Sequence, residues 1–148
     1  MKTEEDAKFH IVLVKGWIQR GGKFLLARRG HTELQKPGVW SLPGGKIESW
    51  TEEPDILQKT LKREIKEEVG VDIEDYVELI YNNSFFRVDG AHVVSLIFLC
   101  RHKSGEAEPL DETSEIKWLT LDELKNFNEA ENFLKDEIDR LDQRMRSL

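Results

Sequence analysis

The chain has 148 residues and a formal net charge of −7, with 29 acidic against 22 basic side chains. This length predicts one domain, residues 1–148, since domains commonly span ~100–200 residues. The acidic balance argues against binding to long nucleic acid, which depends on Lys and Arg neutralising phosphates. A small phosphorylated molecule stays compatible with this charge where a metal ion offsets the repulsion.

Compartment and cysteine chemistry follow from two short segments. Residues 1–8 are polar and acidic, unlike a signal peptide, and predict a flexible tail on a cytoplasmic protein. The apolar run Val93–Cys100 is far shorter than the ~20 residues of a membrane helix, so no membrane association is expected. Cys100 is the single cysteine and predicts a buried structural thiol.

The first half of the chain predicts a hairpin followed by loops. Residues 10–18 and 24–28 are rich in apolar and β-branched side chains and flank a turn at 19–23, which predicts two paired strands. Residues 30–39 are typical of a loop, and Pro43-Gly44-Gly45 is predicted to be loop backbone as well.

A helix is predicted next, with Thr51 as its N-cap and Gly70 just past its end. Its apolar stripe recurs every four residues: Leu57, Leu61, Ile65 and Val69.

The second half predicts strands and a final helix. Residues 76–86 and 92–101 form two expected strands joined by a turn at Asp89-Gly90, and 115–119 form a shorter one. The last helix has one apolar face, made by Leu134, Ile138, Leu141 and Met145. This order of elements predicts an α+β domain, layered α/β/α, with a mixed sheet.

Three glutamates on the first helix form the most informative cluster. Glu64, Glu67 and Glu68 share one face over ~4–6 Å of helix axis. Glu64 and Glu68 repel each other at four-residue spacing, and Glu67 and Glu68 oppose the helix dipole in the last turn. A divalent cation would offset both costs, and oxygen ligands suit Mg²⁺ or Mn²⁺. The alternative is a solvated charged face on a structural protein.

Gly45 followed by the segment Arg63–Val71 resembles the Nudix box, G-x5-E-x7-R-E-U-x-E-E-x-G-U, where U is a bulky aliphatic residue. The lead-in at 40–48 and the segment 118–124 also resemble the family. The resemblance implies an α/β/α sandwich around a mixed, largely antiparallel sheet, with the box as a loop–helix–loop motif.

The spacing within the box departs from the family pattern. Arg63 follows Gly45 by 18 residues, four more than the pattern gives. Because four residues is close to one helical turn, a longer helix N-terminus would leave the glutamate face unchanged. The acid that would hold Arg63 stays open among Asp55, Glu52 and Glu53.

The resemblance implies an enzyme that uses divalent metal to hydrolyse a nucleoside diphosphate linked to another group. By position, Glu64, Glu67 and Glu68 would bind the metal together with the carbonyl of Gly45. Glu64 or a loop acid would act as general base, and Arg63 would position the loop through an ion pair. Glu112 is a further candidate ligand or base, with Asp111 and Glu115 as alternates.

Residues on the substrate side are candidates weighed against ordinary surface or core roles. Arg28, with Arg29 beside it, could contact phosphates, and Asn132 could contact a base edge. Phe85 is the first candidate for stacking on a base, and the other aromatic candidates are Trp17, Trp50 and Phe86.

The substrate class is predicted mainly from missing markers. Where relatives specific for ADP-ribose or dinucleoside polyphosphates often carry a proline or a tyrosine, this chain has Ser84-Phe85-Phe86. The first prediction is therefore a MutT-like diphosphatase that converts a (deoxy)nucleoside triphosphate, ordinary or oxidised, to a monophosphate and pyrophosphate. The alternatives are a sugar nucleotide, ADP-ribose or dihydroneopterin triphosphate as substrate, or a Nudix-fold sensor that binds a nucleotide without cleaving it. Monomer and homodimer both stay open.

Overall fold

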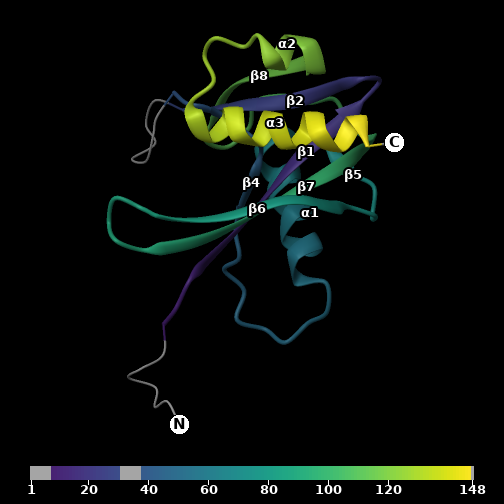
Figure 1. Cartoon of the computed structure of the whole chain (residues 1–148). Helices are drawn as coiled ribbons and strands as arrows, with labels where there is room; N and C mark the ends of the chain where they lie inside the picture. Colours follow the sequence, from purple (N-terminus) through teal and green to yellow (C-terminus); the bar gives the residue numbers. More distant parts are fainter. Residues whose placement is uncertain (1–7, 31–37, 148) are drawn as a thin grey trace.

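The computed structural model describes residues 8–30 and 38–147. The predicted tail, apart from Lys8, and most of the predicted loop at 30–39 lie outside the described residues. The elements in chain order (Figure 1) are β1 (Ile11–Arg20), β2 (Lys23–Arg29), β3 (Trp40–Ser41), β4 (Gly44–Lys46), α1 (Ile56–Val69), β5 (Asp72–Ile73), β6 (Glu78–Phe86), β7 (His92–Ser104), β8 (Thr113–Thr120), α2 (Leu121–Lys125) and α3 (Asn132–Arg146).

Strand β1 is the centre of a mixed sheet. It runs parallel to β7 along all but its last residue, from the pair Ile11–Val93 to the pair Gln19–Arg101. Its pairing with β2 is confined to the hairpin end, and towards its start β4 pairs with it instead. The remaining ladders are antiparallel: β3 and β8 on β2, and β5 and β6 on β7. The predicted mixed, largely antiparallel sheet is confirmed.

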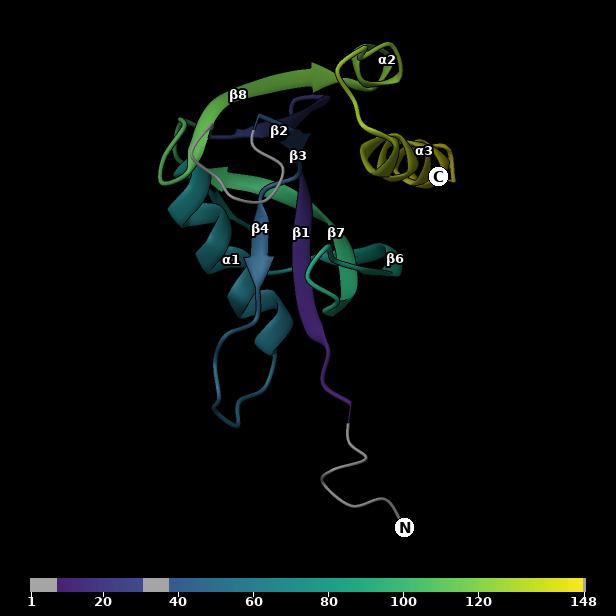
Figure 2. The same ribbon diagram turned by 90° about the vertical axis from the view of Figure 1, so that its left-hand side faces the viewer.

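Helices cover both faces of this sheet, which confirms the predicted three layers (Figure 2). Leu61, Ile65 and Val69 of α1 are fully buried in one apolar cluster against the sheet. A second cluster on the opposite face takes up Leu134, Ile138 and Leu141 of α3. Alternation along each strand sends successive side chains to the α1 cluster and to the α3 cluster.

Cys100 is fully buried in the α1 cluster, as predicted. Burial raises the pKa of its thiol to about 12. Gly70 ends α1 in the left-handed conformation at φ 74°, which glycine adopts without steric cost, so this helix end is also confirmed. In the described part of the chain, no helix is long and apolar enough to cross a membrane.

Two local predictions are wrong. The first helix begins at Ile56 and is preceded by Asp55 in the left-handed conformation, so Thr51 is not its N-cap. Pro54 explains why the helix does not start directly after Thr51, because a proline disfavours helical backbone at the residue before it. The four extra residues of the box therefore lengthen the loop and leave the helix unextended. Gly44 and Gly45, predicted as loop, belong to β4 and pair with Lys15 and Val14 of β1.

Candidate active site

The last turns of α1 lie against β4, and one side-chain hydrogen bond ties the two elements together. The backbone N–H of Gly44 donates to Oε2 of Glu68 at 2.9 Å. Burial nevertheless raises the pKa of Glu68 to about 8, and the nearby charges of Glu64 and Asp111 act in the same direction. A buried carboxylate with acidic neighbours is stabilised in its charged form by a bound cation.

Glu64 packs directly on Gly45. A β-carbon built on Gly45 would lie 2.5 Å from the carboxyl carbon of Glu64, so only glycine leaves room for this contact. Burial also raises the pKa of Glu64, and the positive charge of Arg63 opposes that shift. Carboxylates of Glu64 and Glu68 thus face the two glycines of β4.

Arg63 makes its ion pairs within α1. One guanidinium nitrogen lies 3.4 Å from Glu64 and 3.5 Å from Glu67. The expectation that it pairs with an acid of the preceding loop is therefore wrong. Those acids are displaced because the extra residues form a loop before Ile56; Glu53, for example, pairs with Lys59.

The loop between β7 and β8 brings a further acid to the glutamates. Backbone N–H groups of Glu108 and Leu110 donate to the carbonyls of Val69 and Glu68, so this loop follows the end of α1. Asp111 comes next, in the left-handed conformation at φ 50°, and its charge raises the pKa of both Glu64 and Glu68. Asp111, named from sequence only as an alternate, is thus the loop acid whose charge acts on both glutamates.

Glu112 is exposed, and its backbone carbonyl accepts a hydrogen bond from the N–H of Gly30 at 2.6 Å. Its role as a metal ligand or base stays a prediction, as does that of the carbonyl of Gly45.

The carboxylates fit a hard divalent cation in chemistry but are not gathered around one point. Among the residues that the structure describes, no three His, Cys, Asp or Glu side chains converge closely enough to hold a metal ion. Glu68 instead accepts from Gly44, while Glu64 and Glu67 are held by Arg63. The donor set consists of oxygens on one helix face, two of them on carboxyls whose charged form is disfavoured by burial, which is the chemistry that Mg²⁺ or Mn²⁺ would satisfy.

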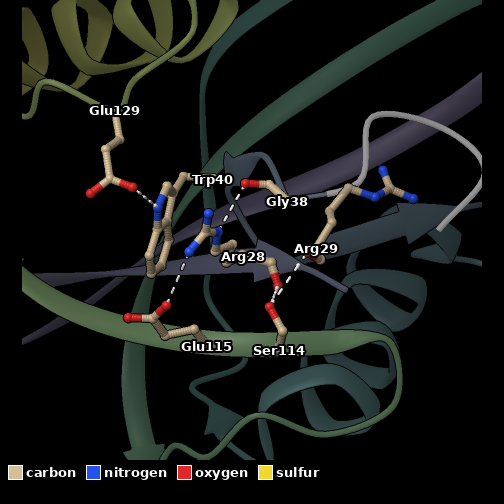
Figure 3. Close-up of polar contacts among 7 residues, drawn as sticks. All are labelled: Arg28, Arg29, Gly38, Trp40, Ser114, Glu115 and Glu129. Atoms are coloured by element: carbon tan, nitrogen blue, oxygen red, sulfur yellow. Dashed lines mark hydrogen bonds and ion pairs between the residues drawn. The ribbon is translucent and has the colours of Figure 1, made fainter. Parts of the chain in front are cut away.

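The side chains of the two arginines at the end of β2 point away from each other (Figure 3). Arg28 lies on the α3 side, over the ring of Trp40, where it donates to the carbonyl of Gly38 at 2.9 Å and pairs with Glu115. Arg29 lies on the α1 side, and its charge lowers the pKa of Glu68. The sequence alone does not show which of the two arginines lies near α1, because that depends on how β2 is oriented in the sheet.

The other predicted substrate residues lie on the α3 side of the sheet. Phe85 of β6 pairs with Val93 and is 42% exposed. Asn132 is the exposed first residue of α3. Phe133, the next residue, lies 5.1 Å from Nζ of Lys15 on β1. The structure thus brings the glutamates, Gly45 and Arg29 together on one side of the sheet and places Arg28, Phe85 and Asn132 on the other.

Among the alternative stacking candidates, the structure separates core from surface. Trp17 is fully buried in the α3 cluster, so it is not available to a ligand. Trp50, in the lengthened loop, is 96% exposed, and Phe86 is 74% exposed.

Comparisons with known proteins agree with the motif and the fold. The NUDIX domain model matches residues 11–141. A MutT-like protein of Streptomyces ambofaciens is 32% identical over 117 residues, covering 78% of this chain and 67% of the relative. An ADP-ribose pyrophosphatase of Methanocaldococcus jannaschii is 29% identical over 126 residues, covering 84% of this chain and 71% of the relative. The crystal structure of a MutT protein from Methanosarcina mazei superimposes with a TM-score of 0.77 at 23% identity, over 95% of this chain and 98% of that one.

The chain therefore belongs to the Nudix family and is a Nudix pyrophosphohydrolase, an enzyme class that generally uses divalent metal ions.

Proposed function

We propose that this enzyme hydrolyses a (deoxy)nucleoside triphosphate, ordinary or oxidised, to a nucleoside monophosphate and pyrophosphate in the presence of Mg²⁺ or Mn²⁺. The observation that carries the proposal is the placement of Glu64 and Glu68 against Gly45 and Gly44. This contact joins the helix and the glycine strand of the box into one acidic site.

Glu64, Glu67 and Glu68 would hold the metal, with the carbonyl of Gly45 as a further oxygen ligand. When bound, a divalent cation neutralises pyrophosphate charge and lowers the pKa of a coordinated water. This neutralisation is needed because the protein has a net charge of −7 and its own field repels an anionic substrate.

The chain's own residues supply positioning and proton transfer. Glu64 would accept the proton of the attacking water, a role favoured by a carboxyl whose pKa is raised by burial. As the new bond to phosphorus forms, pyrophosphate leaves. Arg63 holds Glu64 and Glu67 on the same side of α1 and acts as a positioning residue. Asp111 is the second candidate base, because its charge already acts on both Glu64 and Glu68.

On the α3 side, Asn132 and Phe85 would contact the nucleobase. Both are accessible: Asn132 opens α3, and Phe85 is 42% exposed on the same face of the sheet. Arg28 is only half-buried, but it lies over the ring of Trp40 and pairs with Glu115, so contact of Arg28 with phosphate would require it to leave these partners.

ADP-ribose is the second candidate substrate, because one curated relative is named an ADP-ribose pyrophosphatase. The first candidate is favoured by the likeness to MutT proteins in both sequence and fold. We expect the enzyme to act as a monomer or homodimer in the cytoplasm on small nucleotides, without binding long nucleic acid.

A panel assay at neutral pH, with and without Mg²⁺, tests the proposal. The panel contains ordinary and 8-oxo nucleoside triphosphates, ADP-ribose, a sugar nucleotide and dihydroneopterin triphosphate, with products separated chromatographically. Metal-dependent release of a monophosphate and pyrophosphate from triphosphates supports the proposal. Preferential cleavage of ADP-ribose, or nucleotide binding without turnover of any compound, overturns it in favour of the second substrate or of a sensor.

A further inference from the structure

Two histidines meet at the end of the sheet where β1 and β7 begin. His10 directly precedes β1, and His92 is the first residue of β7. The two strands run parallel with Ile11 beside Val93, so the next step outward places the histidines side by side on one face. Their Nδ1 atoms lie 2.7 Å apart, and the ring centroids are 4.8 Å apart in an edge-on arrangement.

This distance means that the two rings share one proton. One Nδ1 donates and the other accepts, because two lone pairs or two N–H groups would repel at 2.7 Å. When that proton instead sits on Nε2 of its own ring, both Nδ1 atoms present lone pairs to the space between the rings. Metal–imidazole bonds of ~2.0–2.1 Å place two ligating nitrogens roughly 2.9–3.4 Å apart, so the two Nδ1 atoms need to separate by roughly 0.2–0.7 Å from their 2.7 Å contact.

The surroundings restrict the rings and leave the pair open to solvent. The ring of Phe86 lies 4.8 Å from that of His92 and limits its rotation. His10 is exposed, so water can fill the remaining coordination positions. The charged residues of the β6–β7 turn, Arg87 and Asp89, are paired with each other through two hydrogen bonds.

We propose that His10 and His92 form a two-histidine site for a late first-row divalent cation of the Zn²⁺, Ni²⁺ and Cu²⁺ class. These ions bind imidazole nitrogen well, whereas Mg²⁺ prefers oxygen ligands. The site is therefore chemically distinct from the carboxylates of α1. It is also separate in space: Val14, which pairs with Gly45, lies four residues along β1 from His10, about 13 Å at ~3.3 Å per residue. A bound ion would fasten the start of β1 to the start of β7.

Imidazole ¹⁵N NMR during a Zn²⁺ titration, at neutral pH and in excess Mg²⁺, tests the site on the whole chain. The Nδ1 signals of His10 and His92 are expected to shift together and to saturate at one Zn²⁺ per chain. His102, whose Nε2 contacts the carbonyl of Gly105 at 2.6 Å, serves as an internal reference whose signals stay in place. A rise in thermal midpoint should accompany binding, because the ion binds the folded state.

His10→Ala and His92→Ala should each weaken Zn²⁺ binding at least about tenfold, which corresponds to ~1.4 kcal/mol. Both positions are at the surface end of a strand, so retained folding is checked from the backbone amide spectrum. His102→Ala and Glu67→Gln are the controls and should leave the paired shift unchanged. An absent shift at the pair, or a shift at His10 that survives His92→Ala, overturns the proposal.

Discussion

Gly45 and Glu64 are in contact across the interface between β4 and α1, and the carboxyl group of Glu64 occupies the space of a missing β-carbon. The contact depends on a strand pairing that places Gly45 opposite Val14 and on a helix that starts late enough to bring its third turn over that strand. The glycine of the box is therefore required by packing at this point.

Gly45→Ala should reduce turnover without unfolding the protein. The new methyl group would lie 2.5 Å from the carboxyl carbon of Glu64, which is the far part of a flexible side chain and can move away. We expect a loss of about 10–100-fold in activity or metal affinity, as for other residues that support metal ligands. Steady-state kinetics against Mg²⁺ concentration measures the effect.

Gly44→Ala is the matched comparison, one residue away. Its β-carbon would meet the backbone carbonyl of Val14, which cannot move without separating β4 from β1. This variant should lose ~1–3 kcal/mol of stability in denaturant unfolding. Equal loss of stability in both variants would contradict a specific role for the contact between Gly45 and Glu64.

Glu67→Gln should abolish most turnover and leave the fold intact. Glu67 is half-exposed and contacts Arg63, so its charge is not needed for packing. We expect kcat to fall at least about 100-fold and stability to change by less than ~0.5 kcal/mol. Glu131→Gln, a change at an exposed residue beside α3, is the control with unchanged kinetics. A variant at Glu67 that keeps full activity would remove this residue from the site.

Lys15→Met should strongly destabilise the protein through Glu137. Nζ of Lys15 lies 2.6 Å from Glu137 Oε2, and the two side chains are only 12% and 5% exposed. Removing the cation leaves a buried carboxylate, which costs about 3–5 kcal/mol. The double variant Lys15→Met, Glu137→Met should recover most of that loss, as chemical denaturation of the wild type, the two single variants Lys15→Met and Glu137→Met, and the double variant would show. A double variant as unstable as the single one would contradict this account.

Glu78 should contribute stability that depends on pH. Hydrogen bonds from the guanidinium of Arg144, at 2.5 and 2.8 Å, lower the pKa of Glu78 below its usual value of 4.5. A lowered folded-state pKa gives stabilisation that is present above the usual value and is lost as pH falls through the folded value. Wild type should therefore exceed Glu78→Gln in stability at neutral pH, and the two should converge in acid.

The same pH dependence should disappear in Arg144→Gln, because the partner that lowers the pKa of Glu78 is then gone. Thermal unfolding of the three proteins across acidic and neutral pH measures both effects. A difference between wild type and Glu78→Gln that persists in strong acid would assign it to packing instead.

The glutamate face of α1 was predictable from the sequence because helical periodicity is a local property. Glu64, Glu67 and Glu68 share a face in any regular helix, and the apolar stripe that includes Leu61 and Ile65 decides which side is buried. The same reasoning predicted the hairpin of β1 and β2 and the apolar face of α3. Pro54 is a further sequence signal for the late start of α1, because a proline disfavours helical backbone at the residue before it.

What the tertiary structure alone decided depends on contacts between distant segments. Arg29, and not Arg28, lies near α1 because of how β2 faces the two helical layers. Asp111 lies near Glu64 and Glu68 because the β7–β8 loop binds the end of α1. The meeting of His10 and His92 results from the register of two strands about 80 residues apart in the chain. Spacing along the sequence determines which side chains share a face of one element, whereas strand register and layer packing determine which faces meet.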